Sequence, residues 1–278
     1  MSDPPSIITL ELPSIPENLT LVRGMLGGVA ELLAMDAELL DDLKTAVSEA
    51  ANNVVMHAYG GEAGPLAIEL SVTDEGLEAV IRDEGIGISE LAPVEDRIQG
   101  VGLPVMEALS QQADFRRKDD GGTEVRMLFP AHRNGRPLFG LPASAAPEDG
   151  WSSRLSGDAV VSLSPVALLA SVLGRLARAL AATARFSLDR FSDVYLVTDS
   201  IAAHAARAAV GDRIGFSLQA SPRRLELRIG PFQAGSSELL KEDNGRSKSP
   251  LVLLSDELEV EPAEGGEMLR VVMIDHRR

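Results

Sequence analysis

The two halves of the chain repeat one order of secondary-structure patterns, and this repeat restricts the fold more than any other feature of the sequence. Each half predicts a strand, two helices, a β-hairpin, a third helix and a closing strand. The first series lies at 6–12, 16–35, 37–61, 65–85, 100–113 and 121–129, and the second series begins at residue 158. The sequence therefore predicts two α+β domains in tandem.

Matching positions in the two halves keep a nearly constant separation. Asp199 follows Glu49 by 150 residues, Leu225 follows Leu77 by 148, and Gly266 follows Gly122 by 144. A few loop deletions in the second half would produce this slow decrease. We interpret the pattern as a divergent internal duplication.

The composition fits two soluble globular domains. The chain has 278 residues, 45% of them hydrophobic and 24% charged, and a typical domain has about 100 to 200 residues. A stretch rich in Gly, Pro, Ala and Ser separates the halves. We expect a first domain at 1–132, a linker at 133–157 and a second domain at 158–278.

Charge and residue content exclude several classes of protein. The net charge of −16 disfavours a general binder of nucleic acid or of anionic membranes. The longest apolar stretch, 164–186, contains Arg175, Arg178 and Arg185 and is not suited to span a bilayer, and the N-terminal sequence has no signal-peptide pattern. The chain has no cysteine, which excludes disulfides and thiolate metal sites. We therefore expect a cytoplasmic protein.

The predicted helix at 37–61 carries polar residues that folding alone does not require. Glu49, Asn53 and His57 are four residues apart and so share one face of the helix. Asn is unfavourable inside a helix, because its amide competes for backbone hydrogen bonds, and here Asn52 and Asn53 are adjacent. This face is either a solvated surface or part of a site, and we assign His57 to packing or to hydrogen bonding around such a site.

Further polar and glycine-rich segments suggest ATP with magnesium as the ligand. The Asn53 carbonyl is a hard oxygen donor suited to Mg²⁺. Asp83 could accept a hydrogen bond from the exocyclic amine of adenine, and Glu49 could act as general base on an attacking hydroxyl. Glycines before a helix leave amides for phosphate groups and allow a loop to move as a lid. The candidate loop and strand residues are Gly85, Gly87, Gly100, Gly102, Gly122 and Thr123.

Four motifs together resemble a known superfamily. The segments "SEAANNVVMHAY", "DEGIGI", "GVGL" and "GGTEV" look like the asparagine box and the three glycine boxes of the GHKL (Bergerat-fold) ATPase/kinase superfamily. The segment "LKTAVSEAANNVVMHAYG" most resembles the anti-sigma-factor serine/threonine kinases of bacterial stress response and sporulation. The resemblance covers residues 5–130. It implies a two-layer α/β sandwich, with a mixed sheet, helices on one face, and ATP bound between sheet and lid.

The resemblance also implies roles for individual residues. Glu49 matches the general base, Asn53 the magnesium ligand and Asp83 the adenine-binding residue. Arg97 is the candidate contact to the terminal phosphate, and an ordinary exposed arginine is an equal alternative. The other matched positions are the nucleotide-loop glycines and the threonine of the last box near adenine: Gly85, Gly87, Gly100, Gly102, Gly122 and Thr123.

The second half lacks these motif residues. Ala203 stands in place of the magnesium ligand, Pro231 in place of the adenine-binding aspartate, Gln233 in place of the first glycine and Glu267 in place of the threonine. We expect a degenerate pseudo-domain that binds no ATP and packs on the first domain as an intramolecular pseudo-dimer. The alternative is a tethered docking domain without fixed contact, and homo-oligomers are also compatible with the resemblance.

Two hypotheses for function follow from the resemblance. The first is an ATP- and Mg²⁺-dependent protein serine/threonine kinase that acts as an anti-sigma factor or partner-switching transcription regulator. Its partners would be a sigma factor and a small antagonist protein that it phosphorylates. The second is an ATP-gated binding module that sequesters a protein partner without phosphoryl transfer.

Overall fold

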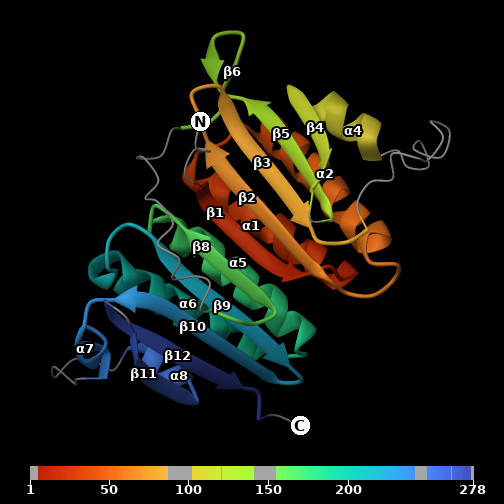
Figure 1. Cartoon of the computed structure of the whole chain (residues 1–278). Coiled ribbons are helices and arrows are strands. Elements are labelled where there is room, and N and C mark those ends of the chain that lie inside the picture. Colours follow the sequence, from red (N-terminus) through yellow and green to blue (C-terminus); the bar gives the residue numbers. More distant parts are fainter. Residues whose placement is uncertain are drawn as a thin grey trace. The chain divides into compact units, whose positions relative to one another are not determined.

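The computed structural model contains two compact units, residues 1–142 and residues 143–278. Each unit has a main sheet and its own helices (Figure 1). No helix among the described residues is long and apolar enough to cross a membrane. The structure describes residues 6–86, 102–119, 121–140, 155–241, 249–263 and 265–276.

The first unit follows the predicted order of elements. Strand β1 is followed by helices α1 and α2, the hairpin β2–β3, helix α4 and strands β4 and β5. The bounds are β1 (Ser6–Pro13), α1 (Leu19–Leu32), α2 (Ala37–Asn53), β2 (Pro65–Val72), β3 (Gly76–Asp83), α4 (Gly102–Leu109), β4 (Gln112–Arg117) and β5 (Thr123–Pro130). Two short helical turns complete the unit: a 3₁₀ turn (Pro16–Asn18) and a π-helical turn (Val54–Ala58).

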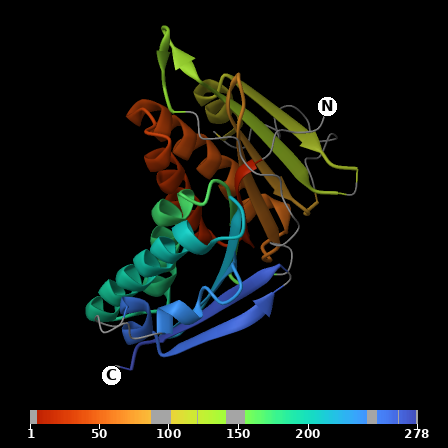
Figure 2. The same cartoon turned by 90° about the vertical axis from the view of Figure 1, so that its left-hand side faces the viewer.

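The sheet of the first unit is antiparallel, and its helices cover one face (Figure 2). Its strand order is β1-β2-β3-β5-β4, and each neighbouring pair is antiparallel. The mixed sheet that the resemblance implied is therefore wrong for the described strands. The reason is the helix pair between β1 and β2: α1 and α2 run in opposite directions, so the chain re-enters the sheet antiparallel to β1.

Alternating burial explains how this sheet forms a core. Leu66, Ile68 and Leu70 of β2 are buried, while the residues between them are more exposed or polar. Leu39 and Leu43 of α2 are buried at helical spacing. Because side chains alternate between the two faces of a strand, this register directs one apolar face toward the helices.

Helix α2 begins and ends at residues that favour these positions. The Asp36 carboxylate accepts a hydrogen bond from Glu38 N at 3.1 Å and caps the helix N-terminus. After the π-helical turn the chain leaves the helix through Gly60 and Gly61, which have φ values of 63° and 96°. These left-handed conformations favour glycine, because glycine has no Cβ atom that would clash with the backbone.

The sequence prediction missed strand β4. A helix was expected at 100–113, but α4 ends at Leu109 and Gln112 starts a strand. In β4, Ala113 lies opposite Met127 and Phe115 opposite Val125 of β5. Pairing with β5 therefore determines the conformation of a short segment that carries little periodicity of its own.

Part of the predicted linker packs on the first unit. Strands β6 (His132–Arg133) and β7 (Arg136–Pro137) form a small hairpin. Beyond it Leu138 and Phe139 are buried, and the Leu138 carbonyl oxygen accepts a hydrogen bond from Asp36 N at 2.7 Å. The prediction that the linker begins at residue 133 was therefore wrong, because buried apolar side chains keep 133–140 on the first unit.

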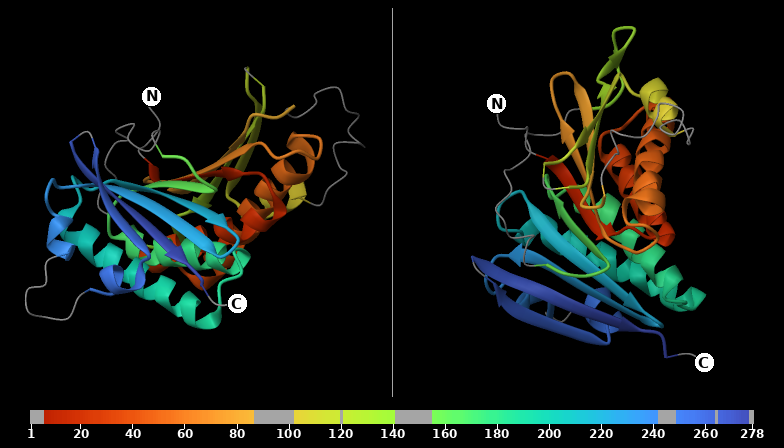
Figure 3. Two further views of the ribbon diagram at one scale, coloured as in Figure 1. Left: turned by 90° about the horizontal axis from the view of Figure 1, so that it is seen from below. Right: turned by 45° about the vertical axis from the view of Figure 1, so that its right-hand side comes forward.

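The second unit has the same order of elements and the same strand order as the first. Its sheet runs β8-β9-β10-β12-β11 in antiparallel pairs, with α5 and α6 on one face (Figure 3). The bounds are β8 (Ala159–Leu163), α5 (Leu168–Thr183), α6 (Leu188–Ala208), β9 (Ile214–Ser221), β10 (Arg224–Phe232), α7 (Glu238–Lys241), α8 (Pro250–Leu254), β11 (Glu257–Ala263) and β12 (Gly266–Ile274).

Strand register agrees between the units at the separations that the sequence suggests. Leu77 of β3 lies opposite Phe129 of β5, and Leu225 of β10 lies opposite Met273 of β12. The first pair of counterparts is 148 residues apart and the second pair 144. An ion pair also recurs in this register, since Arg126 contacts Glu78 at 2.9 Å and the Arg270–Glu226 pair has the same distance.

Candidate functional site

The candidate site is built around the end of strand β3. Asp83 is the last residue of the strand, and it is only 4% exposed. Its Oδ1 accepts a hydrogen bond from Gly85 N at 2.8 Å, which bends the chain into a turn. Among the described residues none donates a hydrogen bond to the other oxygen, Oδ2. Asp83 therefore offers an available acceptor oxygen to a ligand.

Two glycines allow three backbone segments to meet at this carboxylate. A methyl group at Gly85 would overlap the carbonyl oxygen of Ala58, and one at Gly122 would overlap that of Asp83. Gly122 has a φ of 79° and donates a hydrogen bond to the Gly85 carbonyl oxygen at 2.9 Å. The structure thus brings together the turn after β3, the end of the α2 region and the start of β5.

The polar face of α2 is retained in the structure. Glu49 and Asn53 are half-buried, and neither has a hydrogen-bond partner among the described residues. Helix α2 packs against β3, the strand that ends at Asp83, and also contacts β5 and α4. His57 is exposed on the π-helical turn. Two of the three side chains therefore remain available as oxygen ligands or as a base.

The remaining predicted residues divide into two groups. Gly102 begins α4, and Thr123 begins β5, where it is half-buried and lies opposite Arg117. The other three, Gly87, Arg97 and Gly100, lie outside the described residues.

Sequence reasoning missed Tyr59, which contacts the turn directly. Its hydroxyl donates a hydrogen bond to the Pro65 carbonyl oxygen at 2.6 Å and accepts one from Glu84 N at 2.8 Å. Burial, and to a lesser degree the charges of Asp83 and Glu84, raise the pKa of Tyr59 above its ordinary value, against the opposing effect of the Glu84 amide. The hydroxyl therefore keeps its proton and can donate. The tyrosine closes the motif segment "SEAANNVVMHAY", but periodicity and spacing assigned it no role.

The second unit places a different carboxylate at the corresponding turn. Glu267 of β12 is 7% exposed, and it accepts hydrogen bonds from Gly235 N at 2.9 Å, Ser236 Oγ at 3.2 Å and Ser237 N at 2.6 Å. Burial alone would raise the pKa of Glu267, but these hydrogen bonds outweigh it and lower the pKa. Both oxygens of Glu267 are therefore engaged by the protein itself.

Strand β10 also differs at the position that corresponds to Asp83. Pro231 occupies this position and has no side-chain acceptor. The strand continues one residue further, to Phe232, whose ring lies 4.9 Å from that of His204 on α6. Apolar and internally bonded groups thus fill the place where the first unit has an available carboxylate oxygen.

The chemistry of the first site suits a ligand with an amine and several oxygen-rich groups. A buried carboxylate oxygen binds an amine hydrogen strongly, because charge-assisted hydrogen bonds strengthen away from water. The close-packed glycine backbone allows a flat group to approach the turn. Glu49 and Asn53 add a carboxylate oxygen and an amide oxygen. These oxygens can coordinate a metal ion or accept a proton, but they cannot donate hydrogen bonds to an anion.

Comparison with known proteins agrees with this architecture. Residues 12–129 match the histidine kinase-like ATPase domain, and this match lies entirely within the first unit. Fold and site thus define a domain of this class.

Sequence relatives identify the particular family. Serine-protein kinase RsbW of Listeria innocua is 36% identical over 134 residues, covering 43% of this chain and 84% of the relative. Anti-sigma F factor of Caldanaerobacter subterraneus is 28% identical over 138 residues, covering 46% of this chain and 96% of the relative. The chain belongs to the family of the serine-protein kinase RsbW.

A solved structure also matches. The RsbU and RsbW domains of Rv1364c from Mycobacterium tuberculosis align with 47% of this chain and 34% of that chain, at 22% identity and a TM-score of 0.36.

Proposed function

We propose that the first unit binds ATP with Mg²⁺ and that the protein is a serine/threonine protein kinase of the anti-sigma-factor type. The observation that carries this proposal is Asp83, a buried residue beside a glycine turn whose Oδ2 receives no hydrogen bond from the described residues, in a chain that belongs to the RsbW family. By the family relation its partners would be a sigma factor and a small antagonist protein, and its role would be partner-switching control of transcription.

Asp83 would select adenine. Its available oxygen can accept a hydrogen bond from the exocyclic amine, whereas guanine presents a carbonyl oxygen at that position and would be repelled. The Gly85 amide already holds the other oxygen at 2.8 Å, so the carboxylate needs no reorganisation when the base binds. Thr123, Gly85 and Gly122 would border the base.

Asn53 and Glu49 would serve the phosphate end. The Asn53 side-chain oxygen would hold Mg²⁺, which when bound neutralises phosphate charge. Glu49, one helical turn away, would take the proton of the attacking serine or threonine hydroxyl and orient that oxygen toward the terminal phosphate. Gly87, Gly100, Gly102 and Arg97 remain predicted as loop and phosphate contacts.

The second unit would be a degenerate copy of the first that binds no ATP. Its identical strand order and matching register support common origin, and Glu267 uses both oxygens on Gly235, Ser236 and Ser237. We retain the prediction that it acts through its surface, as a pseudo-dimer partner of the first unit or as a docking domain.

Glu49→Gln separates the kinase from an ATP-gated binding module. The neutral amide cannot take a proton, so the variant should bind ATP normally but transfer phosphate at least about a hundredfold more slowly. ATP binding would be measured by calorimetry, and transfer from labelled ATP would be followed to proteins that co-purify with the chain from its native host.

The matched control is Glu38→Gln, which changes the same residue type at the opposite end of α2. It should leave both binding and transfer unchanged. A wild-type chain that binds ATP but phosphorylates none of its captured partners would favour the binding module, and absence of ATP binding would refute both.

A further inference from the structure

The hydroxyl group of Tyr59 occupies the place of an interstrand hydrogen bond. Strands β2 and β3 pair as far as Leu66 opposite Asp83, so continued pairing in this register would set Pro65 opposite Glu84. Instead, the hydroxyl lies between these two residues, accepting from Glu84 N at 2.8 Å and donating to the Pro65 carbonyl oxygen at 2.6 Å. The strand pairing therefore ends directly after Asp83.

The tyrosine ring is held in this position by its surroundings. A methyl group at Gly64 would overlap the ring, so only glycine leaves room for it. Gly64 is itself fixed by Ser14, whose amide donates to the Gly64 carbonyl oxygen at 2.8 Å and whose hydroxyl accepts from Gly64 N at 3.0 Å. On the other side of the turn, Ile86 N donates to the Ala58 carbonyl oxygen at 2.9 Å. Gly64 and the turn thus hold the ring from two sides.

The second unit shows the same region without a tyrosine. Ala209 follows Tyr59 by 150 residues, the separation that also relates Asp199 to Glu49. Ala209 pairs directly with Phe232 in an isolated β-bridge, and Gln233 N donates to the Ala208 carbonyl oxygen at 2.7 Å. Without an inserted hydroxyl, strand β10 continues past Pro231, the counterpart of Asp83.

We propose that Tyr59 is a positioning residue for adenine recognition. Its hydroxyl ends strand β3 at Asp83 and holds the Glu84 amide, which keeps the available Asp83 oxygen at a fixed place. This inference rests on the proposed nucleotide function of the first unit. The tyrosine touches neither adenine nor phosphate in this role, so it acts through the turn alone.

The test compares Tyr59→Phe with Tyr195→Phe, which changes the only other tyrosine of the chain. Tyr195 lies on α6 and is 51% exposed, and its replacement should have no effect. Tyr59→Phe should weaken ATP binding about tenfold, as expected for the loss of a hydrogen-bond bridge that holds the turn. It should also reduce the ratio of ATP to GTP affinity by several-fold, because Asp83 is no longer held. A purely structural loosening would weaken both nucleotides equally and leave this ratio unchanged.

A second measurement works without nucleotide. Hydrogen exchange of the Glu84 amide, followed by NMR in the full chain, should be about tenfold faster in Tyr59→Phe than in the wild type and unchanged in Tyr195→Phe. If the wild type binds no ATP, the proposed function fails, while the exchange rate still decides whether Tyr59 holds the turn. Wild-type exchange at Glu84, or an unchanged ATP-to-GTP ratio in a chain that binds ATP, overturns the inference.

Should Tyr59→Phe fail to fold, Gly64→Ala displaces the ring and keeps the hydroxyl. It should show the same faster exchange at Glu84. An unchanged Glu84 exchange rate in that variant also overturns the inference.

Discussion

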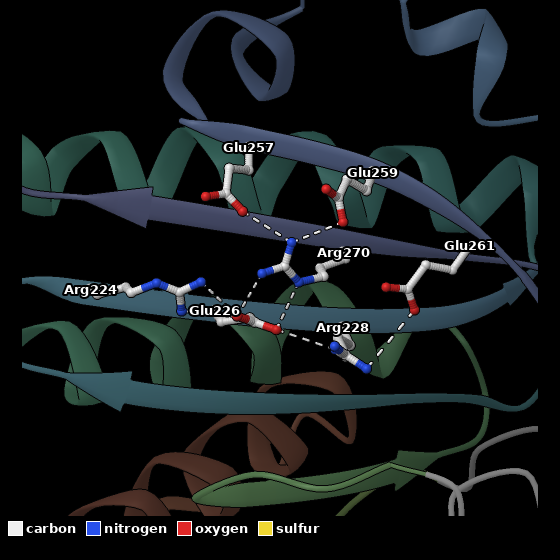
Figure 4. Close-up of polar contacts among 7 residues, drawn as sticks. All are labelled: Arg224, Glu226, Arg228, Glu257, Glu259, Glu261 and Arg270. Atoms are coloured by element: carbon white, nitrogen blue, oxygen red, sulfur yellow. Dashed lines mark hydrogen bonds and ion pairs between the residues drawn. The ribbon is translucent and has the colours of Figure 1, made fainter.

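Acid should destabilise the second unit through Glu226, which lies at the centre of an ion-pair cluster on β10 and β12 (Figure 4). Its Oε2 accepts from Arg224 at 2.8 Å, and its Oε1 accepts from Arg270 at 2.9 Å and from Arg228 at 3.2 Å. Hydrogen bonds from Arg270, followed by those from Arg224 and Arg228, outweigh the effect of burial and lower the pKa of Glu226 to about 2. The unfolded chain has the ordinary value of 4.5.

The magnitude follows from linkage between protonation and folding. A pKa difference of this size corresponds to about 3 kcal/mol of stability at neutral pH, and about 2 kcal/mol of it would be lost by pH 3. Arg224 and Arg228 are 34% and 42% exposed, so solvent screening reduces the loss to about 1 kcal/mol. Because the folded pKa is depressed, this stability is present above the unfolded value of 4.5 and falls as the pH approaches 2.

The assay is urea unfolding followed by circular dichroism at pH 7 and pH 3, with Glu226→Gln compared to the wild type. The variant should be less stable at pH 7 by about 1 to 2 kcal/mol and should lose correspondingly less stability on acidification. Glu78→Gln is the matched control, since Glu78 has the same place in the first unit but pairs with one arginine among the described residues, Arg126 at 2.9 Å. Equal acid-induced losses in the wild type and Glu226→Gln would refute the reasoning.

Three further substitutions test the two sites. Asp83→Asn should weaken ATP binding by about 1 to 3 kcal/mol, because the amide also presents donors to the adenine amine. Calorimetry would measure this loss, with Asp74→Asn as the control. Equal affinity of the wild type for ATP and GTP would remove the adenine assignment. Asn53→Ala should raise the Mg²⁺ concentration needed for ATP binding about tenfold, judged from magnesium titrations, while Asn52→Ala should not. Glu267→Gln should destabilise the second unit by about 1 to 3 kcal/mol in urea unfolding and leave one ATP bound per chain. A second ATP bound to the wild type would contradict the assignment of Glu267 to the structure of the turn.

The long helix and the hairpins were predictable because their signals are local. Residues 37–61 carry helical periodicity that stops at Gly60 and Gly61, and the structure places α2 at 37–53 and the π-helical turn directly after it. Alternating residues around a turn at 74–76 likewise predicted β2 and β3. Both signals depend on neighbours within a few residues, so a single sequence contains them.

The features that were missed depend on distant parts of the chain. Strand β4 is specified by pairing with β5, and the burial of Leu138 and Phe139 depends on the first unit already being folded. Tyr59 matters because the ends of β2 and β3 meet at its hydroxyl, a contact that joins Pro65 and Glu84. Spacing in the sequence contains no information on which hydroxyl stands between two strand ends.

The two units both have a carboxylate at this turn, but they differ in whether one of its oxygens is available to a ligand. Both turns contain a buried acidic residue that accepts hydrogen bonds from backbone amides, because such a turn leaves backbone N–H groups without a partner in the sheet. In the first unit the acid is Asp83, whose short side chain accepts from the Gly85 amide, and no described residue donates to its other oxygen. In the second unit the longer Glu267 reaches across from the neighbouring strand and uses both oxygens. A fully paired carboxylate stabilises the turn, and a half-paired one can bind a base, so this difference in hydrogen bonding would suffice to make one unit a nucleotide site and the other a scaffold.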